Sequence, residues 1–168
     1  MRLTVLSDIH DQHDHLRSIL ERVRSQKPDA LILCGDLTRP AVLEACKAAV
    51  PKLAFCLGNC DRGHAEELRQ SGVVLNAAAW DAVGVFPLDD GGSVAFAHEP
   101  GVARRAALEG GHRAVFFGHT HRPFEEHLNL AEPRGTLLAN PGDVEGRYHR
   151  VGGLTWDSRT GRIHWFEL

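Results

Sequence analysis

The sequence predicts an α/β fold in which two packed mixed β-sheets are flanked by helices, a four-layer αββα sandwich. Two observations carry this prediction. The first seventy or so residues alternate strand-like runs with helical patterns, as in a parallel sheet with helices on its faces. Later residues form short strand-like runs separated by turn residues, which predicts a second, mostly antiparallel sheet. A length of 168 residues suits a single domain, residues 1–168.

The first half of the chain contains three predicted strands and two clear helical segments. Leu16, Ile19, Leu20 and Val23 recur at helical spacing after an opening apolar strand. The second strand is a continuous apolar run, typical of a strand that is buried on both faces, and Pro40 suits the first turn of the next helix. The predicted elements are a strand at residues 3–6, a helix at 12–26, a strand at Ala30–Cys34, a helix at Pro40–Val50 and a strand at Lys52–Leu57.

The second half begins with a predicted hairpin. The runs Val83–Phe86 and Ser93–Ala97 flank the turn signal Asp89-Asp90-Gly91-Gly92, and a short helix follows Pro100. Five more strand-like runs follow: Ala114–Phe117, Phe124–Leu130, Gly135–Ala139, Gly152–Trp156 and Arg162–Phe166.

Composition excludes several classes of function. A formal net charge of −3 gives no basic excess for binding duplex nucleic acid. No apolar run approaches the roughly 20 residues of a membrane span, so no membrane association is expected. Two of the four cysteines lie in apolar strand-like runs and no leader-like segment opens the chain, which predicts reduced thiols and a cytoplasmic protein.

An exposed edge strand could support a homo-oligomer.

Polar side chains follow the predicted strands where ligands collect in parallel sheets, beyond the carboxyl ends. An aspartate alone there is more typical of a turn or a helix cap, but carboxylates and imidazoles together suit divalent ions such as Mn, Fe, Zn or Ni. Seven ligands exceed one tetrahedral site and would fit two ions that share a carboxylate. The candidate ligands are Asp8, His10, Asp36, Asn59, His98, His119 and His121.

Five motifs occur in a fixed order between about residues 3 and 143. They are Asp8-x-His10, Gly35-Asp36, Gly58-Asn59-Cys60-Asp61, His98 and Gly118-His119-Thr120-His121. This series resembles the calcineurin-like metallophosphoesterase family, in particular its small phosphodiesterase branch. By that resemblance, one ion would be held by Asp8, His10, Asp36 and His121, and the other by Asp36, Asn59, His98 and His119.

The resemblance implies a dinuclear metal-dependent phosphoesterase, more a phosphodiesterase than a monoesterase, with a small phosphate ester as its substrate. A hydroxide bridging two divalent ions would attack phosphorus in line. Manganese is the expected metal, with Fe, Zn, Ni and Co as alternatives. Asn59 would stabilise the charge of the transition state, and Cys60 or Asp61 would assist the leaving group.

The chain departs from the family pattern at several places, one of which is Asp11, where relatives frequently carry glycine after the first histidine. Glu99 and Pro100 follow His98 where relatives often have glycine, and a carboxylate there would repel a phosphate or attract a cation. Cys60 occupies the position where larger phosphatases carry a histidine that protonates the leaving oxygen, which predicts a preference for good leaving groups. Asp143 replaces the usual hydroxyl in an Asn-Pro-Gly turn that is expected to orient ligand histidines.

Two other functions fit the same motifs. One is a non-catalytic scaffold that binds a protein partner, as retromer-type relatives are said to do, although such relatives lose metal ligands. The other is a nucleotide or pyrophosphate hydrolase with the same chemistry, which substrate profiling would separate.

Overall fold

A computed structural model gives the structure of residues 1–128, 135–148 and 150–168. The elements are, in chain order, β1 (Arg2–Leu6), α1 (His13–Gln26), β2 (Ala30–Cys34), α2 (Pro40–Lys47), β3 (Leu53–Cys56), the 3₁₀ helix η1 (Asn59–His64), α3 (Ala65–Val74), β4 (Ala78–Trp80), β5 (Val83–Pro87), β6 (Ser93–Ala97), α4 (Pro100–Glu109), β7 (Ala114–Phe116), β8 (Phe124–Leu128), β9 (Thr136–Asn140), β10 (Gly152–Asp157) and β11 (Ile163–Glu167).

The first sheet has the strand order β11-β10-β1-β2-β3-β4. Strands β1 to β4 are parallel, as the alternation of strands and helices predicts. Strands β10 and β11 continue the sheet beyond β1 in antiparallel pairing. The sequence places these last two strands in the second sheet, and that prediction is wrong. Since β1 is apolar on both faces, it would make a poor exposed edge, and the almost fully buried β10 covers it.

The second sheet has the strand order β5-β6-β7-β9-β8. The predicted hairpin is confirmed, because β5 and β6 are antiparallel neighbours. The sheet is nevertheless mixed, and the prediction of a mostly antiparallel sheet is wrong. Helix α4 crosses over between β6 and β7, which makes that pair parallel, and β7 and β9 are parallel too. Strand β8 was predicted as Phe124–Leu130, of which residues 129 and 130 lie outside the described residues.

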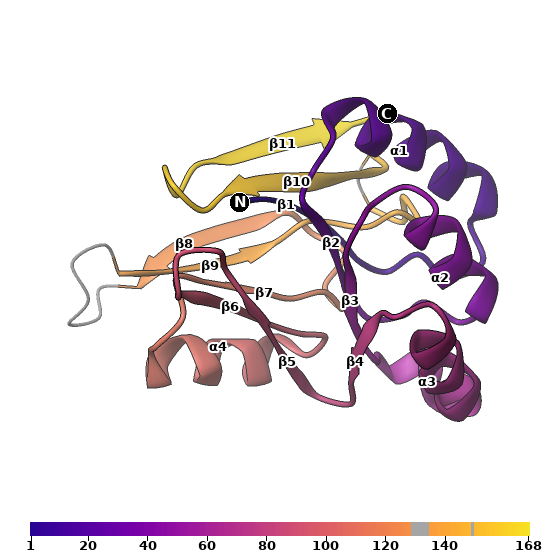
Figure 1. Ribbon diagram of the computed structural model, residues 1–168, viewed down its shortest axis with the longest axis horizontal. Helices are drawn as coiled ribbons and strands as arrows, with labels where there is room; N and C mark the ends of the chain where they lie inside the picture. Colours follow the sequence, from indigo (N-terminus) through magenta and orange to yellow (C-terminus); the bar gives the residue numbers. More distant parts are fainter. Residues whose placement is uncertain (129–134, 149) are drawn as a thin grey trace.

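The two sheets pack face to face between two layers of helices, which confirms the four-layer αββα fold (Figure 1). One apolar cluster joins α1, α2 and α3 to the outer face of the first sheet. A second cluster fills the space between the sheets, where Phe96, Phe116 and Trp156 are almost fully buried. A third joins α4 to the outer face of the second sheet. Because the central strands of both sheets are covered on both faces, ligands are expected at the carboxyl ends of the strands.

Some boundaries and elements differ from the prediction. Helix α2 ends at Lys47 rather than at Val50, because Val50 precedes Pro51 and a residue before proline disfavours the helical conformation. No boundaries were predicted for helix α3 or strand β4. Helix α3 buries only Leu68 and Gly72, so its apolar periodicity is weak. Strand β4 has three residues, of which two are alanines.

None of the helices in the described ranges is long and apolar enough to cross a membrane. The four cysteines all lie in those ranges and all are free thiols, three of them buried and Cys60 exposed.

Candidate metal centre

Six loops meet at one edge of the two sheets, after β1, β2, β3, β6, β7 and β9. Backbone hydrogen bonds join several of them. The Asp8 N–H donates to the Gly35 carbonyl at 3.1 Å, and the Gly118 N–H donates to the His98 carbonyl at 3.1 Å. The His98 ring also bonds the Cys34 carbonyl, which links the second sheet to the first. All seven predicted ligands lie on these loops, so the fold brings them to one place.

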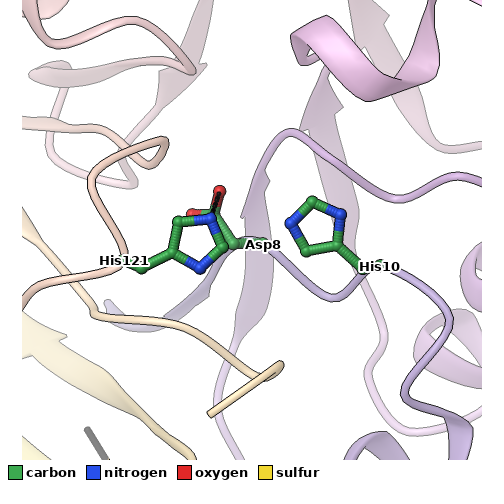
Figure 2. Close-up of side chains that lie close together, drawn as sticks. All are labelled: Asp8, His10 and His121. Atoms are coloured by element: carbon green, nitrogen blue, oxygen red, sulfur yellow. Dashed lines mark ion pairs between the residues drawn. The ribbon is translucent and has the colours of Figure 1, made fainter. Parts of the chain in front are cut away.

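Asp8, His10 and His121 form a first group of candidate ligands. Figure 2 shows their side chains close together, with His10 and His121 coming from different loops. The His121 Nε2 atom lies 3.4 Å from Asp8 Oδ1, and the two imidazole rings stack with centroids 5.3 Å apart. The backbone N–H of His119 lies 3.1 Å and 3.0 Å from the two Asp8 oxygens and fixes the carboxylate.

The Asp8 carboxylate is fully buried, and burial raises its pKa. A hydrogen bond from Ser7 and the interaction with the nearby His98 and His121 lower the pKa in part. A buried carboxylate of this kind is costly as an anion unless a positive charge lies beside it. The environment of Asp8 therefore favours a bound cation.

Asn59, His98 and His119 form a second group. The Asn59 Oδ1 atom lies 2.9 Å from His98 Nε2 and 2.9 Å from His119 Nδ1, and the two ring nitrogens are 3.2 Å apart. Because the Cys34 carbonyl accepts a hydrogen bond from His98 Nδ1, a neutral His98 turns the lone pair of Nε2 toward the Asn59 oxygen. The Asn59 amide nitrogen in turn donates to Cys60 Sγ at 3.3 Å. The lone pairs of His98 Nε2 and Asn59 Oδ1 therefore face each other without a proton between them. A cation bound at this position would accept both.

Asp36 lies between the two groups. Its Oδ1 atom accepts a hydrogen bond from the Cys60 N–H at 2.8 Å. Its Oδ2 atom lies 3.8 Å from His10 Nε2 and 3.5 Å from His98 Nε2. One oxygen is thus fixed by the backbone, and the other faces both sets of ligands.

Backbone strain is concentrated at the site. Left-handed φ values are uncommon outside glycine and cost on the order of 1–3 kcal/mol each. Five of the seven predicted ligands have them: Asp8 (52°), His10 (50°), Asp36 (55°), His119 (69°) and His121 (59°). The rest of the fold must stabilise these conformations, which is typical of residues that are held in place for a function.

Two glycines are required by close packing around the site. A Cβ atom on Gly58 would lie 2.1 Å from Asp36 Oδ1, and one on Gly118 would lie 2.0 Å from Ser7 Oγ. Gly58 precedes Asn59 and Gly118 precedes His119, so the Gly-Asn and Gly-His motifs reflect close packing of the backbone against polar side chains of the site.

Asp61 was predicted to assist the leaving group, and its position does not support that role. The side chain is fully buried and its oxygens accept three backbone hydrogen bonds. Oδ1 accepts from the Leu37 N–H at 2.8 Å and the Thr38 N–H at 2.7 Å, and Oδ2 accepts from the Gly58 N–H at 2.7 Å. Asp61 therefore joins the loops after β2 and β3.

Cys60 remains exposed next to the second group. Partial loss of hydration and the neighbouring Asp36 carboxylate raise the pKa of Cys60 to about 11. The thiol is therefore protonated at neutral pH in the protein alone, and it would be a weak acid toward a leaving oxygen.

The turn after β9 contributes two acidic side chains to the site. Asp143 Oδ2 lies 2.8 Å from His121 Nδ1, which is the contact with a ligand histidine that the sequence predicts. Asn140 Nδ2 donates to the Gly118 carbonyl at 2.8 Å and supports the neighbouring loop. Glu145 was not predicted, and its Oε2 atom lies 3.5 Å from both His10 Nε2 and His121 Nδ1. The only sequence signal was its position two residues after Asp143.

A groove of about 390 Å³ opens beside the second group. Arg62 and Arg69 contribute to its wall, and Arg69 is paired with Asp81 and Glu66. Arg62 has no ion-pair partner in the part of the chain that the structure describes. Glu99, the predicted obstacle to phosphate, lies at the groove with its Oε2 atom 3.9 Å from His119 Nε2.

The donor atoms fit divalent metal ions. Ligands that share an ion with bonds of about 2.0–2.3 Å lie about 3–4 Å apart, which is the spacing of the ring nitrogens and carboxylate oxygens described above. Imidazole and oxygen donors without thiolates are typical of Mn, Fe, Ni or catalytic Zn. His10 Nε2 is buried without a hydrogen-bond partner among the described residues, as expected of a nitrogen reserved for a metal.

The chain is similar in sequence to known phosphoesterases. Residues 1–156 match the calcineurin-like phosphoesterase superfamily domain. Phosphodiesterase MJ0936 of Methanocaldococcus jannaschii is 26% identical over 149 residues, which cover 87% of this chain and 86% of that protein.

Solved structures share the fold. An archaeal phosphodiesterase superposes with a TM-score of 0.86 at 22% identity over 100% of both chains. The phosphoesterase Yfce of E. coli gives a TM-score of 0.69 at 18% identity over 99% of both chains, and Vps29 of Entamoeba histolytica complexed with Zn²⁺ gives 0.68 at 12% identity over 100% of this chain and 98% of that one. With a domain match that spans nearly the whole sequence, the chain belongs to the calcineurin-like phosphoesterase superfamily.

Proposed function

We propose that the protein is a dinuclear metal-dependent phosphoesterase that hydrolyses small phosphodiesters in preference to monoesters. The observation that carries this proposal is the position of Asp36 Oδ2, 3.8 Å from His10 Nε2 and 3.5 Å from His98 Nε2. An oxygen that faces two ligand groups suits a bridge between two ions. Family membership and the phosphodiesterase relative support the reaction class.

Each ion would have its own set of ligands. Asp8, His10, Asp36 and His121 would hold the first, and Asp36, Asn59, His98 and His119 would hold the second. Manganese fits this mixture of oxygen and imidazole donors, and Fe, Zn, Ni and Co are alternatives. Two such ions would supply water activation near neutral pH and neutralisation of the phosphate charge.

The residues of the chain would position the reacting groups. The Asn59 amide nitrogen donates to Cys60 Sγ, which leaves Asn59 Oδ1 facing the two imidazoles, and the Cys60 N–H fixes the carboxylate of Asp36. These constraints preorganise the site for in-line displacement, in which the attacking and leaving oxygens lie on opposite sides of phosphorus. Cys60 is only a weak acid toward a leaving oxygen, so esters with good leaving groups should react faster.

The groove beside the second group favours a diester. It lies next to Asn59 and His98 and has room for a second ester group. Arg62 in its wall would bind the phosphate or a neighbouring anionic group of a small substrate.

Activity after removal of metals tests the proposal. Protein treated with a chelator would be assayed with Mn²⁺, Ni²⁺, Co²⁺ or Zn²⁺, on bis(4-nitrophenyl) phosphate and on 4-nitrophenyl phosphate. We expect turnover only with added metal and a higher kcat/KM for the diester. Absence of turnover with all four metals would contradict the proposal, and faster hydrolysis of the monoester would contradict the preference.

A second candidate is a scaffold that binds a protein partner. One observation favours it: Val73 and Val74 at the end of α3 are more than four-fifths exposed. Two adjacent valines are a small patch, and the ligand set has no role in such a scaffold. The scaffold function would be supported if the protein had no activity with any metal and the metal-free protein bound a partner through Val73 and Val74.

A further inference from the structure

Glu145 lies in the loop after β9 and turns its side chain toward the first group of ligands. Its backbone N–H donates to the Asp8 carbonyl at 3.0 Å, and the neighbouring Val144 N–H donates to the Ser7 carbonyl at 3.1 Å. Two backbone bonds therefore fix this loop to the end of β1. Only one-fifth of the Glu145 side chain is exposed.

The atoms that face one another here lack hydrogen bonds. His10 Nε2 and Glu145 Oε2 are 3.5 Å apart, both are buried, and neither has a hydrogen-bond partner among the described residues. Asp143 is fully buried, and its Oδ1 atom is also without one in the same ranges. Buried polar atoms are nearly always bonded in proteins, and 3.5 Å is a spacing expected of two ligands on one ion.

The charges around this point do not balance. Asp8, Asp36, Asp143 and Glu145 bring four carboxylates to the cluster. Arg147 is the arginine beside them, with its Nε atom 3.3 Å from Glu145 Oε2, and half of its side chain is exposed. A half-exposed ion pair offsets little of the cost of burying several carboxylates. A cation inside the cluster would offset much more.

We propose that Glu145 is an additional ligand of the ion held by Asp8, His10 and His121. This inference rests on the proposed function, because it concerns the same metal centre. A further carboxylate oxygen raises the coordination number and the negative charge of the first ion site. The higher coordination number shifts the preference of the site from Zn²⁺, which prefers four ligands, toward Mn²⁺.

Metal binding by Glu145→Gln tests the inference without an activity assay. Equilibrium dialysis of metal-stripped protein against Mn²⁺ would give the number and affinity of bound ions. We expect the wild type to bind two ions. We expect Glu145→Gln to bind one of the two at least about tenfold more weakly than the wild type does. The rise in Tm on adding Mn²⁺ should be smaller in the variant, since stabilisation follows ligand affinity. The Tm of the metal-free variant shows whether it folds.

Two matched variants separate metal binding from ion pairing. Glu126 is paired with Arg104 outside both ligand groups, so Glu126→Gln should bind Mn²⁺ like the wild type. Arg147→Ala should bind Mn²⁺ as tightly as the wild type or more tightly, because it removes a competing positive charge.

The outcomes distinguish two failures. If the wild type binds two ions and Glu145→Gln binds both as tightly as the wild type does, the inference is wrong and the proposed function stands. The same holds if Arg147→Ala weakens Mn²⁺ binding as much as Glu145→Gln does. If the wild type binds no Mn²⁺, Ni²⁺, Co²⁺ or Zn²⁺, both are wrong.

Discussion

The Oδ2 atom of Asp36 lies 3.5 Å from the Nε2 atom of His98, although Asp36 follows a strand of the first sheet and His98 follows a strand of the second. The contact is set by the backbone, because the His98 ring bonds the Cys34 carbonyl at 2.9 Å and Asp36 follows Cys34 by two residues. On its other side the same oxygen faces His10. This arrangement places one carboxylate where two ions would share it.

Asp36→Asn should impair both ion sites at once. The amide keeps the shape of the side chain but removes the shared negative charge, so we expect Mn²⁺ binding to weaken at both sites and kcat/KM for an activated diester to fall about 100-fold or more. Dialysis and steady-state kinetics measure the two effects. Asp89→Asn, an exposed aspartate, is the control. Loss of only one ion would argue against the bridging position.

Cys60→His should supply the missing acid. In the metal-free protein, partial loss of hydration and the Asp36 carboxylate raise the pKa of Cys60 to about 11, so its thiol is a weak acid there. A histidine near its usual pKa of about 6.5 would be a stronger one. We expect kcat/KM for an alkyl diester to rise about tenfold at pH 7, with little change for a 4-nitrophenyl diester. Equal effects on both substrates, or none, would mean that protonation of the leaving group does not limit the rate.

Asp61→Ala should destabilise the fold. Three backbone N–H groups, those of Leu37, Thr38 and Gly58, lose their acceptor. Unsatisfied buried donors cost about 1–3 kcal/mol each, and relaxation recovers part of this, so we expect a loss of about 3–5 kcal/mol in the free energy of unfolding. Urea denaturation measures it, with Asp89→Ala as the surface control. An unchanged midpoint would show that the loops after β2 and β3 do not depend on this carboxylate.

Arg62→Ala should raise KM for an anionic diester about fivefold to tenfold and leave kcat nearly unchanged, because the arginine would contact bound substrate away from the reacting bond. Arg69 contributes to the wall of the same groove but is already paired with Asp81, so Arg69→Ala should change KM less. Comparable effects of the two variants would contradict a specific role for Arg62.

Asp8→Asn should stabilise the metal-free protein at neutral pH. Burial raises the pKa of Asp8 above its ordinary value of 3.8, so the folded protein holds this proton more tightly than the unfolded chain. The stabilisation is complete below pH 3.8 and is lost as the pH rises through the raised pKa. The variant does not ionise there, so we expect its Tm in chelator at pH 7 to exceed that of the wild type by about 2–4 °C. The difference in Tm between Asp8→Asn and the wild type should disappear in acid. A lower Tm for the variant than for the wild type at pH 7 would contradict the prediction.

Much of the fold could be predicted because its elements have strong patterns. The buried run Ala30–Cys34 and the spaced apolar residues of α1 indicate a strand and a helix without any tertiary information. Sheet membership could not be predicted for β10 and β11, because antiparallel strands at the end of a chain can join either sheet. Strand β4 is too short to have a pattern of its own.

The site could be predicted where ligands follow strands directly. Asp8 and His10 occur at a strand end, and their side chains converge despite left-handed φ values that no propensity predicts. The role of Asp61 was misjudged, because its three backbone partners come from two separate loops. Glu145 was missed because only the tertiary fold places the loop after β9 against the end of β1.

The most direct test of the proposed bridge between two metal ions at Asp36 is a crystal structure grown with Mn²⁺, with anomalous diffraction to locate the metal. The account predicts two Mn²⁺ peaks about 3.5–4 Å apart on either side of Asp36 Oδ2. A single peak that Asp36 does not contact, or no peak at full Mn²⁺ saturation, would contradict it.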